Sequence, residues 1–226
     1  MYIEMKEAIF LREEKRRFLC KIYIDGEEKL CHVPSSAKLR NYLDLKEHKA
    51  LVTLNTSKNC RTDYKLMALY VDEQWVLVNL SIVNALVKEY KEEQGELVSG
   101  ERKVSKEYKS DLVVRDEGSQ KERLVEIKSI ISMCDKAIVP HNSGERAIRQ
   151  LKYLFMVLKK DCYLVEYDFV LLNKNIKRIE FDNQEKEYRR LFKQCKKKGM
   201  ETHIYQIHVK KKYITIHEDH EIEIFG

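Results

Sequence analysis

The sequence has 226 residues, of which 43% are hydrophobic and 35% are charged, and its formal net charge is +6. This length can bury one large core or two small ones. With only 7 glycines and 2 prolines, the composition excludes a collagen-like or low-complexity chain. The mild basic excess permits a polyanionic partner but does not require one.

Cysteine spacing and hydropathy narrow the class of protein further. The 6 cysteines are spread along the chain without a Cys-x-x-Cys pair, and this spacing does not favour a zinc site. No run of about 18 apolar residues offers a membrane span. The N-terminal residues also lack the apolar segment of a signal peptide. We therefore expect free thiols in a reducing cytoplasm and no membrane association.

Short strands dominate the first part of the chain. Residues 7–33 are expected to form strands, with Asp25-Gly26 as a hairpin turn between two of them. Further short strands are expected at 51–54, 66–71 and 75–78. Several short strands with little helix between them indicate a small β-barrel or a curled sheet.

The pattern changes near residues 79–81, where we place the domain boundary. Ser81 is a candidate cap for a helix that carries Ile82, Val83, Leu86, Val87 and Tyr90 at helical spacing. We then expect a hairpin at 110–115 and 122–131, an amphipathic helix at 144–160, a buried strand at 162–172, a helix from a cap at Asp182 to Lys198, and strands near 201–209 and 213–225. Alternating strands and helices predict an α/β domain.

Three charged residues on the expected hairpin suggest a catalytic site. Glu126 and Lys128 are two residues apart, so they share one face of a strand, while their neighbours point into a core. A hairpin whose turn is centred on Gly118-Ser119 places Asp111 directly opposite Glu126. Opposed carboxylates repel each other, and a divalent cation such as Mg²⁺ would compensate. A lysine beside them is suited to activating water or stabilising a phosphate.

Each of these residues also has a plain structural interpretation. Glu-x-Lys is common on a half-exposed strand simply because both side chains face water, and a bulge would shift the register of the hairpin. Glu107 is a candidate further metal-side carboxylate or an ordinary surface glutamate. Arg146, Arg149, Gln150 and Lys152 lie on the polar side of the expected helix, where they either meet phosphates or form a solvated face.

The order of several segments resembles the sugar fermentation stimulation (SfsA) family. The matching segments are Arg17-Phe18, His32-Val33-Pro34, Arg61-Thr62-Asp63-Tyr64-Lys65-Leu66, Asn79, Asp111 with Glu126-Ile127-Lys128-Ser129, and Pro140 with Arg146-Ala147-Ile148-Arg149-Gln150-Leu151. Some positions differ from the family pattern. The loop at residues 34–38 lacks the family's glycine. In residues 139–150, the family's aspartate, threonine, glycine and histidine are replaced by His141, Gly144, Ala147 and Gln150. We therefore interpret the chain as a divergent member.

The resemblance implies an α+β protein of two domains. An OB-fold-like β-barrel would span residues 1–80, and a PD-(D/E)XK nuclease-like α/β domain would span residues 81–226. It implies DNA binding, and by position it makes Asp111, Glu126 and Lys128 the catalytic residues. With Mg²⁺ or Mn²⁺ as cofactor, Asp111, Glu126 and the carbonyl of Ile127 would be the metal ligands. Because dimers are common among nuclease-fold proteins, we also expect a homodimer by analogy.

Two functions remain open at this stage. One is metal-dependent hydrolysis of DNA or RNA, with Glu107, Arg146 and Gln150 as additional site residues. Arg16, Arg17, Lys38, Arg61 and Arg149 would then contact the nucleic acid. The alternative is a non-catalytic DNA-binding regulator of sugar metabolism genes, which would bind through basic clusters near residues 12–17, 196–198 and 210–212 with strong salt dependence. His217 and His220 are metal candidates, although a surface tail is the simpler interpretation.

Overall fold

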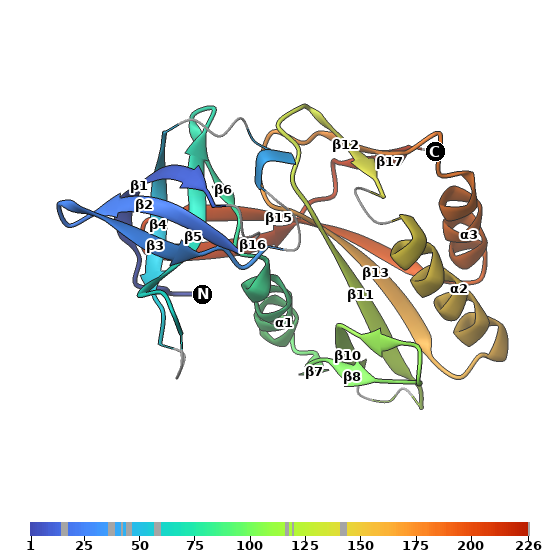
Figure 1. Ribbon diagram of the computed structural model, residues 1–226. Helices are drawn as coiled ribbons and strands as arrows, with labels where there is room; N and C mark the ends of the chain where they lie inside the picture. The colour runs from blue at the N-terminus through green and yellow to red at the C-terminus, as the bar shows by residue number, and fades with distance from the viewer. Residues whose placement is uncertain are drawn as a thin grey trace.

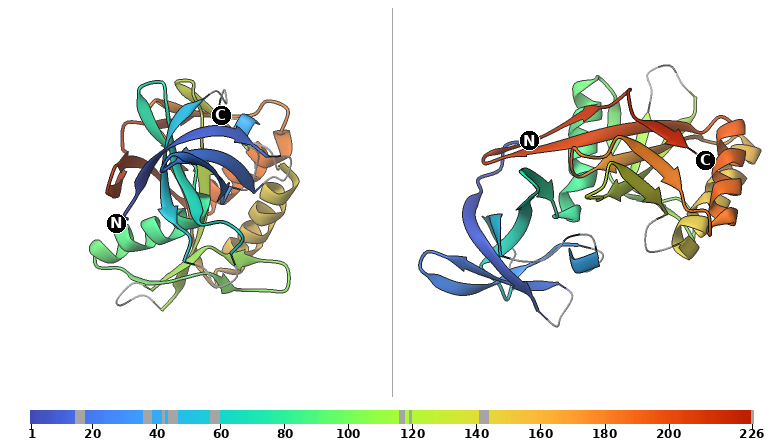
Figure 2. Two further views of the ribbon diagram at one scale, coloured as in Figure 1. Left: turned by 60° about the vertical axis from the view of Figure 1, so that its left-hand side comes forward. Right: turned by 90° about the horizontal axis from the view of Figure 1, so that it is seen from above.

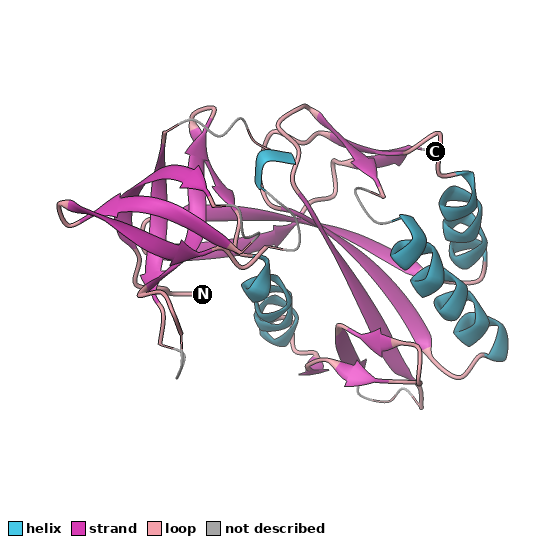
Figure 3. Ribbon diagram, in the orientation of Figure 1, coloured by secondary structure: helices cyan, strands magenta, loops and turns pink. Residues whose placement is uncertain are grey.

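The computed structural model describes residues 1–14, 18–35, 39–41, 43, 47–56, 60–115, 118, 120–140 and 144–225. They form a barrel at one end of the molecule and a mixed sheet with helices at the other (Figures 1 and 2). Figure 3 shows that strands make up most of both parts. No helix among these residues is both long enough and apolar enough to cross a bilayer.

The N-terminal barrel is built from short strands, as the sequence predicts. They are β1 (Lys6–Glu13), β2 (Leu19–Ile24), β3 (Glu27–His32), β4 (His48–Leu54), β5 (Tyr64–Val71) and β6 (Gln74–Leu77), with a 3-10 turn η1 at Leu39–Asn41. The sheet runs β3-β2-β1-β4-β5-β6, and a further pairing of β3 with β5 closes it. Asp25 and Gly26 adopt positive φ angles of 54° and 86°, so the predicted hairpin turn is confirmed.

A short helical segment joins the two parts. η2 (Leu80–Ile82) leads into α1 (Val83–Glu93). The predicted cap at Ser81 is wrong, because the side chain of Asn79 accepts a hydrogen bond from the Ser81 amide and α1 begins only at Val83. Asn79 is itself buried, and it supplies the side-chain oxygen that a first helical turn needs.

The second part contains all remaining elements. They are β7 (Leu97–Ser99), β8 (Arg102–Lys103), β9 (Lys109–Ser110), β10 (Leu112–Arg115), β11 (Glu122–Ile130), β12 (Lys136–Val139), α2 (Gly144–Lys160), β13 (Leu164–Leu171), β14 (Arg178–Phe181), α3 (Lys186–Lys197), β15 (Glu201–Lys210), β16 (Tyr213–Glu218) and β17 (Glu223–Phe225). The central sheet runs β16-β15-β13-β11-β10-β7, with β11, β13 and β15 parallel. A small parallel sheet, β12-β14-β17, and the β8–β9 ribbon flank it.

The predicted hairpin and its register are confirmed. Leu112 pairs with Val125 and Val113 with Leu124, so the next position along this register sets Asp111 opposite Glu126. Because side chains alternate along a strand, Glu126 and Lys128 lie on one face of the sheet and Val125 and Ile127 lie on the other.

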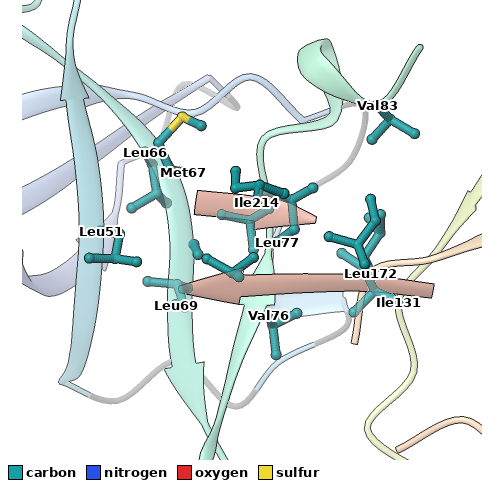
Figure 4. Packing of buried hydrophobic residues seen from close by; sticks show 14 of the residues in the cluster. Leu51, Leu66, Met67, Leu69, Val76, Leu77, Val83, Ile131, Leu172 and Ile214 are labelled. Carbon is teal, nitrogen blue, oxygen red and sulfur yellow. The ribbon is translucent and has the colours of Figure 1, made fainter. Parts of the chain in front are cut away.

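The two faces of the central sheet carry different cores. α2 and α3 lie side by side on the face of Glu126, which we call the front face, and pack there against Leu124, Tyr167 and Phe169. On the back face, α1 packs in a core that also contains the barrel interior. Figure 4 shows this shared core, with Leu69 of the barrel, Leu77, Leu172 and Ile214 converging between the two parts.

Two details near the C-terminus differ from the sequence-based expectation. The helix expected from Asp182 begins at Lys186, because the Asp182 carboxylate accepts from the Gln184 amide and forms a turn instead. The alternation in Ile214-Thr215-Ile216 and in Ile222-Glu223-Ile224-Phe225 predicts an added pair of strands, but the two strands do not pair with each other. β16 extends the central sheet beside β15, whereas β17 joins the small sheet beside β14.

Candidate metal and catalytic site

Asp111 lies between β9 and β10, beside the edge of β11. One carboxylate oxygen accepts from the backbone amide of Ile127 at 2.8 Å, and the other accepts from the side chain of Asn84 at 3.3 Å. The N–H and C=O of one strand residue point to the same edge, so the Ile127 carbonyl also faces the Asp111 side of β11. Asp111 is therefore held between α1 and β11.

Glu126 is almost completely enclosed, with 1% of its surface exposed. The Tyr108 hydroxyl donates to one of its oxygens at 2.8 Å, and the Lys128 ammonium lies 2.7 Å from the other. Burial of a carboxylate without such partners would cost several kcal/mol. The interactions from two elements hold the Glu126 carboxylate in a single orientation.

Lys128 and Gln150 connect β11 to α2. The Lys128 ammonium lies 2.7 Å from the side-chain oxygen of Gln150 and 5.8 Å from the centre of the Tyr167 ring. The amide nitrogen of Gln150 donates to Glu126 as well. Lys128 keeps 25% of its side chain exposed, so a fixed cation is presented to solvent beside two acids.

The two acids repel each other in this setting. Burial, followed by the nearby charge of Glu126, raises the pKa of Asp111 to about 6, despite the opposing effects of the Ile127 amide and Lys128. Burial and the same Glu126 charge raise the pKa of Tyr108 far above its usual value, so Tyr108 stays a hydrogen-bond donor. Two carboxylates thus share one directly bound ammonium, that of Lys128.

These side chains line a cavity of about 230 Å³. Asp111, Glu126, Ile127 and Lys128 form one wall, and Arg146 and Gln150 from α2 form another. Carboxylate, amide and carbonyl oxygens are the donors that Mg²⁺, Mn²⁺ and Ca²⁺ prefer. The donor set and the two facing carboxylates therefore fit a divalent cation.

The other residues singled out from the sequence fall in three places. Arg146 and Gln150 line the cavity, whereas Glu107 and Arg149 lie in an adjoining groove. Arg61 is exposed on the barrel, outside the residues that line the cavity. Arg16, Arg17 and Lys38 lie outside the described residues.

Sequence reasoning missed Tyr108 and Asn84 as partners of the two acids. Tyr108 lies 18 positions before Glu126, and Asn84 lies on a helix 27 positions before Asp111. An aromatic residue three positions before Asp111 was the one local signal. Neither contact follows from periodicity, because each depends on how separate elements pack.

A second polar cluster lies on the back face of the same sheet. Glu166 and Asp168 of β13 have no exposed surface, and Lys91 of α1 reaches both, with Asp168 at 3.8 Å. Arg123 donates to Glu166 at 3.0 Å. Burial and the neighbouring Glu166 raise the pKa of Asp168 well above its usual value. This cluster is a closed ion-pair network in the interior.

A triad of possible metal ligands among the described residues includes one acid of this back-face cluster. Glu166, Glu201 and His203 place one ligand atom each within 4.8 Å of one another. The two cations already bound to Glu166 occupy both of its oxygens, so this triad has less unbalanced charge than the front site. The histidine candidates His217 and His220 do not belong to this triad.

The fold and the cavity together define a class of protein. It is a two-domain α+β protein in which a closed barrel precedes a mixed-sheet domain with an acidic cavity. Residues 75–213 match the family model described as the sugar fermentation stimulation protein RE domain, and residues 13–78 match the SfsA N-terminal OB domain. The chain therefore belongs to the sugar fermentation stimulation protein family, as the sequence motifs predict.

Individual relatives agree with this assignment. A sugar fermentation stimulation protein homolog from Natranaerobius thermophilus is 34% identical over 31% of this chain, a match that spans only 29% of that relative. The homolog from Clostridium acetobutylicum is 26% identical over 93% of this chain and 94% of its own length. The homolog from Bdellovibrio bacteriovorus is 25% identical over 87% of this chain and 88% of its own length.

A solved structure supports the fold. The structure of Pyrococcus furiosus SfsA in complex with Ca²⁺ superposes with a TM-score of 0.79 at 17% identity, and the match covers 99% of this chain and 97% of that one. The expected two-domain α+β architecture with an N-terminal OB barrel is confirmed. The PD-(D/E)XK likeness of the second domain stays a prediction.

Proposed function

We propose that this protein binds nucleic acid and hydrolyses its phosphodiester bonds with the help of a divalent metal ion. The observation that carries the proposal is the convergence of Asp111, Glu126 and Lys128 on one recessed cavity. A surface that only binds phosphate gains nothing from opposed acids, because acids repel phosphate. The same acids are useful if a cation lies between them and the phosphate.

Asp111, Glu126 and the Ile127 carbonyl would hold Mg²⁺ or Mn²⁺. A bound ion of this kind supplies Lewis-acid stabilisation of the phosphoryl oxygens and a more acidic water. A relative's structure is described as a Ca²⁺ complex, which is consistent with an oxygen-rich site in this family. The PD-(D/E)XK resemblance assigns the same roles to these positions.

The chain's own residues have separate tasks in this mechanism. The Lys128 ammonium, held between Glu126 and Gln150, is placed to orient the attacking water and to stabilise charge on the scissile phosphate. Tyr108 fixes Glu126, and Asn84 together with the Ile127 amide fixes Asp111. Arg146 at the cavity wall offers a cation to the phosphate.

The barrel and the basic residues would supply affinity for DNA or RNA. OB folds bind single strands along a positively charged face. We assign this role to Arg61 on the barrel and to Arg149 on α2. Arg16, Arg17 and Lys38 are assigned to it from the sequence alone. Two copies of the chain acting as a homodimer remain part of the proposal.

The test is cleavage of single- and double-stranded DNA and RNA in Mg²⁺ or Mn²⁺. We expect Glu126→Gln and Lys128→Met each to lower the rate on the order of 10³-fold. Glu93→Gln, which changes an exposed acid of α1, is the matched control and should cleave normally. Melting temperatures of all variants confirm that they fold.

Binding to the same nucleic acids in EDTA separates the alternatives. Salt-sensitive binding by a wild type that cleaves nothing with either metal would contradict the catalytic proposal. It would favour the non-catalytic DNA-binding regulator instead. Cleavage that survives in both variants would show that the activity resides elsewhere.

A further inference from the structure

A groove of about 600 Å³ continues from the catalytic cavity along α2. Arg146 and Gln150 line both the cavity and the groove, so the two spaces adjoin. The far part of the groove is lined by Arg149, Tyr153 and Met156, each about one helical turn or less from the next. A chain whose phosphate sits in the cavity would run directly into this groove.

The groove is positively charged. Within the described part of the chain, neither Arg146 nor Arg149 has an ion-pair partner, and both are exposed. Lys152 also lines the groove but is paired with Glu187 at 2.8 Å. Glu107 is the acid that opposes these cations. The two arginines are therefore available to phosphates in the cavity and in the groove beside it.

The floor of the groove is aromatic and apolar. Tyr153 is half-buried and stacks on Tyr108, with ring centroids 4.5 Å apart and an interplanar angle of 16°. Tyr108 in turn donates to Glu126, so a rigid column runs from the catalytic carboxylate to Tyr153. Met156 lies in the same groove and is 50% exposed. The exposed thioether and the fixed tyrosine together give this side of α2 an apolar surface that a base could contact.

We propose that this groove holds the nucleotide next to the cleaved bond as an unpaired base on Tyr153 and Met156, with Arg149 on its phosphate. The substrate would then be single-stranded nucleic acid, or a duplex end whose strands have separated. This proposal rests on the proposed function, because the catalytic cavity defines where the groove begins.

Base stacking is what favours a single strand over an intact duplex. Inside a duplex the bases already stack on each other and their faces are hidden, so an aromatic side chain gains nothing. An unpaired base offers both faces, and stacking on an aromatic ring tolerates any sequence. The recessed position of Glu126 also favours a single backbone that can enter the cavity over a rigid double helix.

The experiment measures binding of fluorescent oligonucleotides in EDTA, so that no cleavage is needed. The probes are a single-stranded DNA, its RNA equivalent, the matching DNA duplex, and the same single strand with consecutive abasic sites. We expect Tyr153→Leu to weaken binding of the single strands about tenfold. Tyr153→Phe should bind them like the wild type, because the π-face is retained.

The abasic strand isolates the stacking contribution. The wild type should bind it about tenfold more weakly than the intact strand, whereas Tyr153→Leu should bind the two equally. Binding of the duplex should not respond to Tyr153→Leu. Equal losses for the single strand and the duplex would overturn the proposal, and so would a wild type that does not distinguish the abasic strand.

Arg149→Gln provides a surface variant in case Tyr153→Leu folds poorly. It should weaken single-strand binding and reduce the slope of log affinity against log salt by about 0.7, the value for one phosphate contact. Lys160→Gln removes an exposed cation at the end of the same helix and should leave both unchanged. Identical behaviour of Arg149→Gln and Lys160→Gln would overturn the assignment. A protein that binds as expected but never cleaves would retain the groove and lose the catalytic proposal.

Discussion

The two faces of the central sheet each carry a pair of acids, and the pairs are held in different ways. On the front, Asp111 and Glu126 line an open cavity with one nearby lysine. On the back, Glu166 and Asp168 are fully buried, and Lys91 and Arg123 bind Glu166 directly. Asp111 and Glu126 face each other across β10 and β11, whereas Glu166 and Asp168 both lie on β13. All four residues are acids of the same sheet, so the surroundings of each pair, and not the residue types, make them different.

This difference separates a structural charge cluster from a candidate functional one. The back-face acids are compensated by the protein cations Lys91 and Arg123, and burial raises the pKa of Asp168 well above its usual value. The front-face acids line a cavity, and burial together with the repulsion from Glu126 raises the pKa of Asp111 to about 6. Residual negative charge at an accessible site is what a divalent cation requires.

Among substitutions that test this difference, removal of the back-face cation Lys91 should have the largest effect on stability. Lys91→Met leaves the buried acids undercompensated and should lower the free energy of unfolding by about 3–5 kcal/mol in urea titrations. Lys88→Met is the matched control, because Lys88 lies on the same helix and makes a partly exposed pair with Glu92 at 3.5 Å. The control should cost less than about 0.5 kcal/mol.

A second substitution sharpens this result. Adding Asp168→Asn to Lys91→Met removes the buried acid that loses its ion pair, so the double variant should be more stable than Lys91→Met alone. Mn²⁺ affinity at the front site should be the same in all folded variants. A cost of Lys91→Met no greater than that of Lys88→Met would break the comparison, since the back-face acids would then not depend on their cation.

The front-face repulsion should appear in the pH dependence of stability. The pKa of Asp111 is raised in the native state, so the native protein binds this proton more tightly than the unfolded chain does. The stabilisation is full below about pH 4 and is lost as pH rises through about 6. Relative to Asp111→Asn, the metal-free wild type should lose roughly 3 kcal/mol at most between these limits.

Metal addition should cancel most of this difference at neutral pH. Mn²⁺ at about 100 times its dissociation constant should stabilise the wild type by about 2.7 kcal/mol and should leave Asp111→Asn nearly unchanged. Urea titrations at pH 4.5 and pH 7, with and without the ion, measure both effects. Equal pH profiles for the two proteins without metal would mean that neither burial nor Glu126 raises the pKa of Asp111 in the native state.

The front site was largely predictable because its signals are local. Alternation in residues 122–130, a glycine at the turn and the spacing of Glu126 and Lys128 define the hairpin and its register before any tertiary contact. The amphipathic pattern of Gly144–Lys160 likewise predicts α2 and its polar side. The family motifs add the order of segments, and with it the barrel.

The back-face cluster and the supporting contacts were beyond this kind of prediction. The β13 segment Leu-Val-Glu-Tyr-Asp-Phe-Val-Leu carries two acids at same-face spacing inside an apolar run, which signals a buried polar pair. Its partner Lys91, however, is 75 positions from Glu166, and only packing joins them. The position of β17 was missed for the same reason, because its partner β14 was not expected.

The smallest effect expected here concerns the hydroxyl that orients Glu126. Tyr108→Phe removes the donor at 2.8 Å but keeps the ring that stacks on Tyr153. Loss of a hydrogen bond to a metal-binding carboxylate typically weakens metal affinity by about 10-fold or somewhat more. Calorimetric titration with Mn²⁺ at pH 7 should therefore give about tenfold weaker binding at an unchanged stoichiometry.

Tyr153→Phe removes the hydroxyl of the neighbouring ring and should bind Mn²⁺ like the wild type. Equal affinities for Tyr108→Phe and the wild type would mean that Lys128 and Gln150 alone hold Glu126, and the site would then depend on α2 and not on the β8–β9 segment.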